Sequence, residues 1–227
     1  MLFQIIDNKQ ICSSIYSNKQ IINDPEYDSL TQTWSYNSSL KDYDIDYASL
    51  YVNGKSLDQS CPDILKDKWE KVKQKHLALL KSFEIGKVNY NDYCFYDLVP
   101  ESFVMEFFEV KSEITEHILK TNEKPGNYDF MVELSELVDG ISKNKLILNT
   151  SGLDESLHQL RTRKFKEKLQ RTSPYVQYNV FGTITGRLTT KKDSFSILTM
   201  DKNYRKIIQP KNDWFIELDF NAAELRC

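Results

Sequence analysis

The sequence predicts an α+β fold, in which a small β element comes first, a mostly helical region follows, and short strands return near the end. Three observations support this prediction: β-favouring runs between Phe3 and Ile22, helical patterns across 62–140, and an alternating segment across 175–183. With 227 residues, the chain is long enough for one large domain or two small ones.

The N-terminal segment favours short strands. Its β-favouring runs are split by Asp7-Asn8-Lys9 and by Ser17-Asn18-Lys19, which are turn-type sequences. We therefore expect a small hairpin-like element there. Residues 23–60 are rich in Tyr, Asp and Ser and show weak periodicity, so we expect loops with occasional strands. Together these segments form the first predicted region, 1–60.

Helices dominate the middle of the chain. Pro62 suits the first turn of a helix that runs to about Phe83, because the first turn does not use the amide hydrogen that proline lacks. Pro100 opens a second helix, whose apolar positions continue on one side as far as Ile118. Pro125-Gly126 ends that pattern.

One more helix, a strand and a basic helix follow. The helix covers Tyr128–Val138 and is expected to stop at Gly140. The apolar run Leu146–Leu148 predicts a short strand. The basic helix is expected from about Asp154 to Gln170.

Charge is unevenly distributed along the chain. The net charge is −3, yet the segment from His158 to Lys211 carries thirteen Lys or Arg residues against three acidic residues. This surplus of ten positive charges predicts a nucleic-acid surface on an otherwise acidic protein. The alternative for such a charge run is a solvated helix face.

Several classes of protein are disfavoured. No apolar run approaches the roughly 20 residues of a membrane-spanning helix, and the N-terminus lacks the features of a signal peptide. The four cysteines form no CxxC pair: Cys12, Cys61, Cys94 and Cys227. The three histidines show no metal-ligand spacing: His76, His117 and His158. We expect a cytoplasmic protein with free thiols and neither a zinc site nor a disulfide framework.

Two motifs near the end of the chain carry the most information. An apolar run, Trp214-Phe215-Ile216, reads as a buried strand and leads to Leu218-Asp219-Phe220-Asn221-Ala222-Ala223-Glu224-Leu225-Arg226. The segment Thr185-Gly186-Arg187-Leu188-Thr189-Thr190 places Arg187 32 positions before Asp219. Together they resemble the T-G-R-L-[ST]-[ST] and D-[YF]-x-x-x-E-L-R motifs of family A DNA polymerases, the class of bacterial polymerase I and many phage replicases.

The resemblance implies a nucleotidyl-transfer site. Asp219 matches a catalytic carboxylate, and the backbone carbonyl of Phe220 matches a second ligand of Mg²⁺ in a two-metal site. Glu224 matches a glutamate that lies under the sugar of the incoming dNTP and leaves no room for a 2′-hydroxyl. Without the motif, Asp219 would read as a turn or cap residue and Glu224 as a surface residue in the first turn of a helix.

The resemblance also implies contacts with primer-template DNA. Arg187 matches an arginine that reaches the minor groove near the primer terminus, where contacts check base-pair geometry rather than sequence. Gly186 allows the tight turn before it. Three hydroxyl residues complete the motif: Thr185, Thr189 and Thr190. The residues of the basic helix that are expected to contact phosphates are Arg161, Arg163, Lys164 and Lys168.

The resemblance covers only part of the chain. Strong matching is confined to 175–226, and Phe195–Thr199 replaces a family stretch that contains Asn and Pro, which suggests a divergent phage-type branch. By order along the chain, 61–150 corresponds to a thumb-like helical region. The region 151–227 corresponds to the basic helix and the first part of a polymerase palm.

The leading hypothesis is the N-terminal portion of a phage-type DNA polymerase that ends just after motif A. We expect it to be inactive alone, because the fingers and the second palm aspartate are missing. One alternative is a non-catalytic DNA-binding protein, and another is one half of a split polymerase that a second polypeptide completes. The final Cys227 adds the hypothesis of an intein or intron after Arg226, against which a truncated sequence is the plain alternative.

Overall fold

The computed structural model describes residues 1–7, 11–88, 93–183, 185–191 and 194–216. The chain mixes helices with four small sheets, which is compatible with the predicted α+β class. It divides into two compact units, Met1–Asp139 (unit 1) and Gly140–Cys227 (unit 2). Unit 1 therefore contains the predicted region 1–60 and most of the predicted region 61–150.

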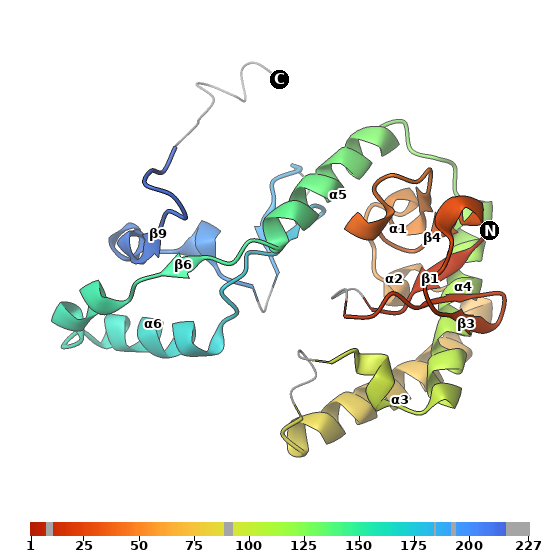
Figure 1. Ribbon diagram of the computed structural model, residues 1–227, viewed down its shortest axis with the longest axis horizontal. Helices are drawn as coiled ribbons and strands as arrows, with labels where there is room; N and C mark the ends of the chain where they lie inside the picture. The colour runs from red at the N-terminus through yellow and green to blue at the C-terminus, as the bar shows by residue number, and fades with distance from the viewer. Residues whose placement is uncertain (8–10, 89–92, 184, 192–193, 217–227) are drawn as a thin grey trace. The chain divides into compact units, whose positions relative to one another are not determined.

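Unit 1 begins with a three-stranded antiparallel sheet. Its strands are β1 (Phe3–Ile5), β2 (Ile15–Ser17) and β3 (Gln20–Ile22), paired in that order (Figure 1). Asn18 and Lys19 join β2 to β3 with φ angles of +48° and +60°. A two-residue hairpin turn of this kind needs positive φ at both positions, which Asn tolerates well. The predicted hairpin-like element is confirmed.

Short helices and a second strand pair follow the sheet. The strands β4 (Gln32–Thr33) and β5 (Asp46–Tyr47) are parallel. The helices are α1 (Ala48–Tyr51) and α2 (Leu57–Ser60), with single 3-10 turns at Tyr27–Ser29, Ser38–Leu40 and Asp63–Leu65. A capping box starts α2, because Ser56 and Gln59 each accept a hydrogen bond from the other's backbone amide. The prediction of loops with occasional strands missed these helices.

Two long antiparallel helices form the centre of unit 1. They are α3 (Lys66–Ile85) and α4 (Glu101–Thr121), and the latter begins directly after Pro100, as predicted. The ion pairs Lys68–Glu113 and Lys75–Glu106 join the two helices, and their numbers run in opposite directions. Both pairs lie at the surface, so they contribute little stability compared with the core.

The core of unit 1 is aromatic and surrounds α4. Eight residues of α4 are buried, among them Phe107 and Phe108. His76 of α3 packs against Phe107 at 5.3 Å and against Phe95 at 5.0 Å between ring centroids. Burial lowers the pKa of His76, so the neutral ring is favoured in this apolar setting. His76 is thus a packing residue, as the absence of metal-ligand spacing predicted.

Side-chain hydrogen bonds tie the N-terminal region to the helices. In the interior, Gln4 of β1 donates to the hydroxyl of Thr115 in α4 at 2.9 Å. The amide of Tyr47 donates to the hydroxyl of Tyr128 at 2.7 Å. Residues of 1–60 and of α3 and α4 also belong to one hydrophobic cluster, so these segments fold around a single core.

Helix α5 (Tyr128–Ser142) extends beyond its predicted end. It passes through Gly140, where a Cβ would meet no atom within 4 Å. The side-chain amide of Asn144 donates to the Gly140 carbonyl at 2.8 Å and supports the last turn. The prediction of a stop at Gly140 is therefore wrong, because glycine is tolerated inside a helix whose end is capped by later residues.

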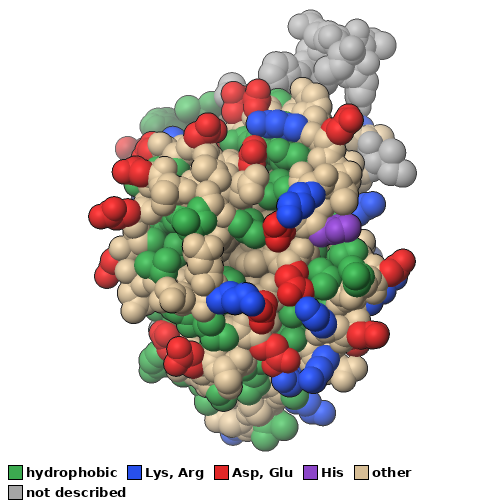
Figure 2. Space-filling model, turned by 90° about the vertical axis from the view of Figure 1, so that its right-hand side faces the viewer, with side chains coloured by type: hydrophobic (Ala, Val, Ile, Leu, Met, Phe, Trp, Pro, Cys, Tyr) green, Lys and Arg blue, Asp and Glu red, His purple; other side chains and the backbone are tan. Residues whose placement is uncertain are grey.

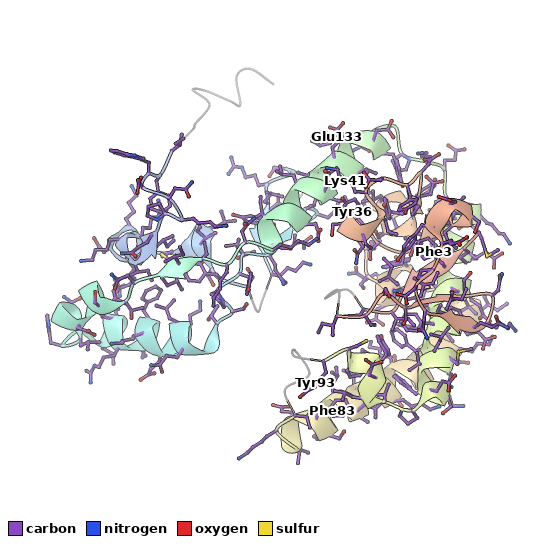
Figure 3. The ribbon with its side chains drawn as sticks, viewed as in Figure 1. Phe3, Tyr36, Lys41, Phe83, Tyr93 and Glu133 are labelled. Atoms are coloured by element: carbon purple, nitrogen blue, oxygen red, sulfur yellow. The ribbon has the colours of Figure 1, made fainter. Side chains whose placement is uncertain are left out.

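Charged and aromatic side chains from the segment between β4 and β5 lie beside the middle of α5. Lys41 pairs with Glu136 of α5 at 2.5 Å. Tyr36 lies next to Lys41, on the same side of α5 (Figure 3). The rings of Tyr36 and Tyr47 meet edge to face, with centroids 5.4 Å apart. Burial raises the pKa of Tyr36 to about 12, so its hydroxyl stays protonated at neutral pH.

Among its described residues, unit 2 contains two strand pairs and one complete α-helix. The strand β6 (Ile147–Leu148) pairs antiparallel with β9 (Ile208–Gln209), which confirms the predicted strand at 146–148. The strand β7 (Tyr178–Asn179) pairs antiparallel with β8 (Thr189–Thr190), so only two residues of the predicted strand 175–183 are regular. The 3-10 helices of this unit are Ser151–Ser156, Ile197–Thr199 and Lys202–Ile207.

The basic helix is α6 (Leu160–Arg171), which begins later than predicted. The 3-10 helix Ser151–Ser156 occupies the first part of the predicted span. Val176, Phe195 and Met200 form the buried centre of unit 2, and Phe165 and Leu169 of α6 pack against it. The helix is therefore amphipathic, with a narrow apolar face and a wide charged face.

The prediction of a buried strand at Trp214-Phe215-Ile216 is not met. These side chains are 82%, 64% and 83% exposed, and the segment has no regular structure. A buried strand needs a neighbouring strand for its backbone groups and apolar cover for its side chains. Among the residues that the structure describes, no strand pairs with this segment.

None of the helices described combines the length and the apolar character that crossing a bilayer requires. Figure 2 shows instead that side chains of both charges are interspersed with apolar ones on the face it presents.

The hydroxyl of Tyr128 provides a test of this packing. Tyr128→Phe leaves the buried amide of Tyr47 without its acceptor and is expected to lower the free energy of unfolding by about 1–3 kcal/mol. Tyr36→Phe is the matched control, because the Tyr36 hydroxyl is buried without a hydrogen-bond partner among the described residues. That control should change stability by less than about 0.5 kcal/mol. Urea unfolding measures both, and equal losses would contradict the assignment.

Candidate nucleic-acid interface

One face of α6 is fixed against the rest of unit 2. The ring of Phe165 stacks on the ring of Tyr204, with centroids 4.4 Å apart and planes 11° from parallel. The hydroxyl of Thr162, which is fully buried, lies 3.3 Å from the hydroxyl of Tyr204. These contacts hold α6 on the 3-10 helix Lys202–Ile207 and set its rotation about its own axis.

A flank of α6, about 100° around the helix from this packed face, carries exposed positive charge. Arg161, Lys164 and Lys168 are three and four positions apart, so they form one stripe along the helix. Arg163 is also exposed but lies about 100° around the helix from Lys164. The structure thus places three of the four predicted phosphate-contacting residues together and the fourth on a different side.

Most of this charge is available to an external partner. Within the described part of the chain, no acidic side chain pairs with Arg161 or Lys164. Lys168 donates to the hydroxyl of Ser196 at 3.2 Å, which orients its ammonium without neutralising it. Lys166, in contrast, pairs with Asp154 at 2.6 Å and is neutralised.

A basic hollow lies beside the start of α6. It has a volume of about 470 Å³, and its lining includes Gln159, Thr162, Lys202 and Lys206. Both lysines are exposed. Sequence analysis did not single out this hollow, because its members come from two segments that are about 40 positions apart.

The Thr-Gly-Arg turn has the geometry that its glycine predicts. Gly186 has a φ of +73°, and its amide donates to the carbonyl of Thr183 at 3.3 Å. The hydroxyl of Thr183 donates to the carbonyl of Arg187 at 3.0 Å. A residue with a side chain would be strained at this φ, so glycine suits the position. Thr185 and Arg187 are exposed on this turn.

A second glycine, Gly182, lies directly against the side chain of Thr189, which follows the turn. A Cβ on Gly182 would lie 1.8 Å from the hydroxyl oxygen of Thr189 and 2.8 Å from its Cβ. Thr189 and Thr190 form β8 and are half-buried, so Thr189 packs on Gly182 rather than standing free. Sequence analysis missed Gly182. The only available signal was a glycine four residues before Gly186 in a segment that reads as a strand.

The predicted catalytic residues lie outside the described residues. Asp219, Phe220 and Glu224 fall within 217–227, so their predicted roles in metal binding and sugar selection stay predictions. Among the described residues, a group with metal-ligand potential is Asp7, Cys12 and Cys94 in unit 1. Its thiols are soft ligands and do not suit Mg²⁺, which prefers oxygen.

Comparison of the chain with protein-family models, with curated proteins and with solved structures found no match. The functional interpretation therefore depends on the motifs of the chain itself and on the geometry of unit 2. The Thr-Gly-Arg turn and the basic helix both belong to unit 2.

Gly182→Ala tests the close approach beneath the turn. The added methyl group must displace the Thr189 side chain, including its Cβ, so the free energy of unfolding of the chain should fall by about 1–3 kcal/mol. Gly152→Ala is the control in the same unit, because a Cβ there meets only a Lys206 side-chain atom at 3.9 Å. Denaturant unfolding should show a loss at position 182 alone. A tolerated Gly182→Ala would mean that the turn is loosely packed.

Proposed function

We propose that this chain contributes to a template-directed DNA polymerase of the family A type, and that it grips primer-template DNA through unit 2. The observation that carries the proposal is the pair of motifs, Thr185–Thr190 and Asp219–Arg226, in this order. Positive charge gathered on the same unit supports it. The same proposal assigns a thumb-like role to 61–150. It assigns the basic helix and the first part of the palm to 151–227.

The stripe on α6 suits the phosphate backbone. From Arg161 to Lys168 the helix rises about 10 Å, which corresponds to about three base-pair steps of 3.4 Å. Three cations in a row can therefore follow successive phosphates of one strand. Such contacts are independent of sequence, as a polymerase requires, since it must move along any template.

The basic hollow extends this surface. Lys202 and Lys206 stand beside the first turn of α6, where backbone amides of the helix also favour an anion. Ammonium groups and helix amides together suit a phosphate group. In the proposal, the hollow receives a backbone phosphate next to those held by the stripe.

Arg187 would face the minor groove near the primer terminus. The acceptors that correct base pairs present there are alike, so an arginine can check geometry without reading sequence. The turn around Gly186 is braced by two hydrogen bonds, which would hold the backbone of Arg187 in place.

The chemistry is assigned to the second motif. The carboxylate of Asp219 and the carbonyl of Phe220 are hard oxygen donors of the kind that Mg²⁺ prefers. Bound Mg²⁺ would promote attack of the primer 3′-hydroxyl on the α-phosphate of a dNTP and stabilise the leaving pyrophosphate. Glu224 would exclude a 2′-hydroxyl by its bulk. A two-metal site needs a second carboxylate, which neither motif supplies, so another polypeptide segment would have to provide it.

A non-catalytic DNA-binding protein is the second candidate. The exposed stripe on α6 and the basic hollow favour it, because both can bind phosphates without any catalytic motif. One half of a split polymerase is a variant of the first proposal. Binding alone does not separate these candidates, whereas primer extension that depends on Asp219 does.

Salt-dependent DNA binding tests the proposed grip. Binding of a labelled primer-template duplex, measured by fluorescence anisotropy, should weaken linearly on a log–log scale between about 50 and 200 mM salt. Replacing the stripe should reduce that slope by about 2–3, because each lost phosphate contact is worth about 0.9. The variant is Arg161→Gln, Lys164→Gln, Lys168→Gln.

The charge-matched control removes three exposed lysines of unit 1: Lys55→Gln, Lys71→Gln and Lys81→Gln. It should keep the wild-type slope, and Arg163→Gln alone should change it little. An equal fall in slope for both triple variants would show that net charge, not the stripe, determines binding. No binding to duplex at low salt would leave α6 as a solvated face and contradict the proposal.

Replacement of Asp219 tests the catalytic assignment. In the polymerase that contains this chain, Asp219→Ala should abolish primer extension, because a ligand of the catalytic metal is lost. Duplex binding should remain. Glu224→Ala is the control in the same motif: it should retain synthesis from dNTP and admit ribonucleotides more readily. Unchanged extension by the Asp219 variant would support the non-catalytic candidate instead.

A further inference from the structure

Two thiols of unit 1 lie in direct contact. The Sγ of Cys12 donates its hydrogen to the Sγ of Cys94 at 3.1 Å, although the residues are 82 positions apart in the chain. Cys12 precedes β2, and Cys94 directly precedes the 3-10 helix Phe95–Leu98. Cys94 is buried, with 1% exposure, whereas Cys12 is half-buried.

We propose that Cys12 and Cys94 are a redox-active dithiol that a low-molecular-weight disulfide converts into an intramolecular disulfide. This site lies in unit 1 and is independent of the proposed DNA polymerase function. It modifies the expectation of free thiols, which rested on sequence spacing that cannot show a contact between residues so far apart.

A hollow beside Cys12 gives a small reagent access to the pair. It has a volume of about 580 Å³, and Asp7, Cys12, Tyr27 and Ser39 contribute to its lining. Cys94 does not line it. Cys12 is therefore the thiol that meets the reagent first, and Cys94 is the thiol that resolves the intermediate.

The exchange balances in two steps. The Cys12 thiolate attacks one sulfur of the reagent, which forms a mixed disulfide and releases the other reagent sulfur as a thiolate. The Cys94 thiolate then attacks the Sγ of Cys12 and expels the second reagent thiolate. The two protein thiols lose two protons and two electrons, and the reagent takes them up to become two thiols.

Metal binding is the rival use of these residues, with Asp7 as a third ligand. Two sulfurs bound to one tetrahedral zinc ion would lie roughly 3.8 Å apart, given Zn–S bonds of about 2.3 Å. The observed 3.1 Å lies between this distance and the roughly 2.05 Å of a disulfide bond. One carboxylate oxygen of Asp7 also accepts hydrogen bonds from the backbone amides of Ile11 at 2.6 Å and of Cys12 at 3.4 Å, so this oxygen is already engaged.

Charge favours the disulfide as well. Metal ligation requires both cysteines as thiolates beside the Asp7 carboxylate, so that Zn²⁺ bound by all three would leave one net negative charge in a partly buried site. In the metal-free pair, burial, the hydrogen bond to Cys94 and the nearby acidic groups raise the pKa of Cys12 to about 12, so Cys12 is protonated at neutral pH. A disulfide is neutral and suits this environment. The same raised pKa makes the first exchange step slow at neutral pH.

The cross-link would join the N-terminal hairpin to the segment that leads into α4. It closes a loop of more than 80 residues, and long loops gain most from a cross-link because the unfolded chain loses most freedom. Oxidation should therefore stabilise unit 1 against heat and leave its fold unchanged.

The experiment compares the full chain after incubation with glutathione disulfide and with dithiothreitol. Alkylation followed by peptide mass spectrometry should find the Cys12 peptide linked to the Cys94 peptide in the oxidised sample only. The oxidised chain should unfold about 5 °C or more above the reduced chain. Dithiothreitol should reverse both effects. Cys12→Ser and Cys94→Ser should each abolish them, whereas the Cys61→Ser, Cys227→Ser variant should retain them.

Three results would overturn the proposal. The first is a stable glutathione adduct on Cys12 with no link to Cys94. The second is a linkage that uses Cys61 or Cys227. The third is stoichiometric binding of Zn²⁺ by the reduced chain, lost in Cys12→Ser, together with resistance to oxidation. If a serine variant fails to fold, mass spectrometry of the wild-type chain still decides between these results and the proposed disulfide.

Discussion

The stack of Phe165 on Tyr204 is the contact on which the candidate interface depends. Helix α6 has only a narrow apolar face, so only one rotation about its axis buries that face. Thr162 reinforces this rotation through the Tyr204 hydroxyl. With the inner face fixed, the stripe from Arg161 to Lys168 must point to solvent, because any other rotation would bury a charge without a partner. The electrostatic surface is thus a consequence of packing inside unit 2.

The two units differ in charge as well as in packing. Unit 2 contains 16 Lys or Arg residues against 9 Asp or Glu, whereas unit 1 contains 14 against 24. Unit 1 uses a broad aromatic core around α4 for its stability, and on the face in Figure 2 charges of both signs are interspersed. An acidic unit repels a polyanion, so attraction to DNA would be confined to unit 2. This separation would help to orient a duplex before specific contacts form.

Local signals predicted much of the fold, and non-local contacts account for what was missed. Pro100 marks the beginning of α4 because proline suits a helix start whatever surrounds it. Gly140 was a weak signal, since the end of α5 depends on Asn144 further along. The prediction of a buried strand at Trp214 was wrong because a strand needs a partner strand that is distant in the sequence. Hydrophobic periodicity cannot reveal such a partner. Likewise, the approach of Gly182 to Thr189 and of Cys12 to Cys94 appears only once the chain is folded.

Sequence-independent binding of phosphates and the proposed check of base-pair geometry place different requirements on the protein backbone. Phosphate contacts tolerate flexible side chains, because a lysine can follow a phosphate that moves. A minor-groove contact at a fixed depth requires a backbone that is held in place before the duplex arrives. The turn at Arg187 meets this second demand through Gly182, Gly186 and the hydroxyl of Thr183. The backbone is thus held in place at the turn of Arg187, where the proposed check of base-pair geometry occurs. The stripe on α6, where only attraction to phosphates is needed, uses long charged side chains.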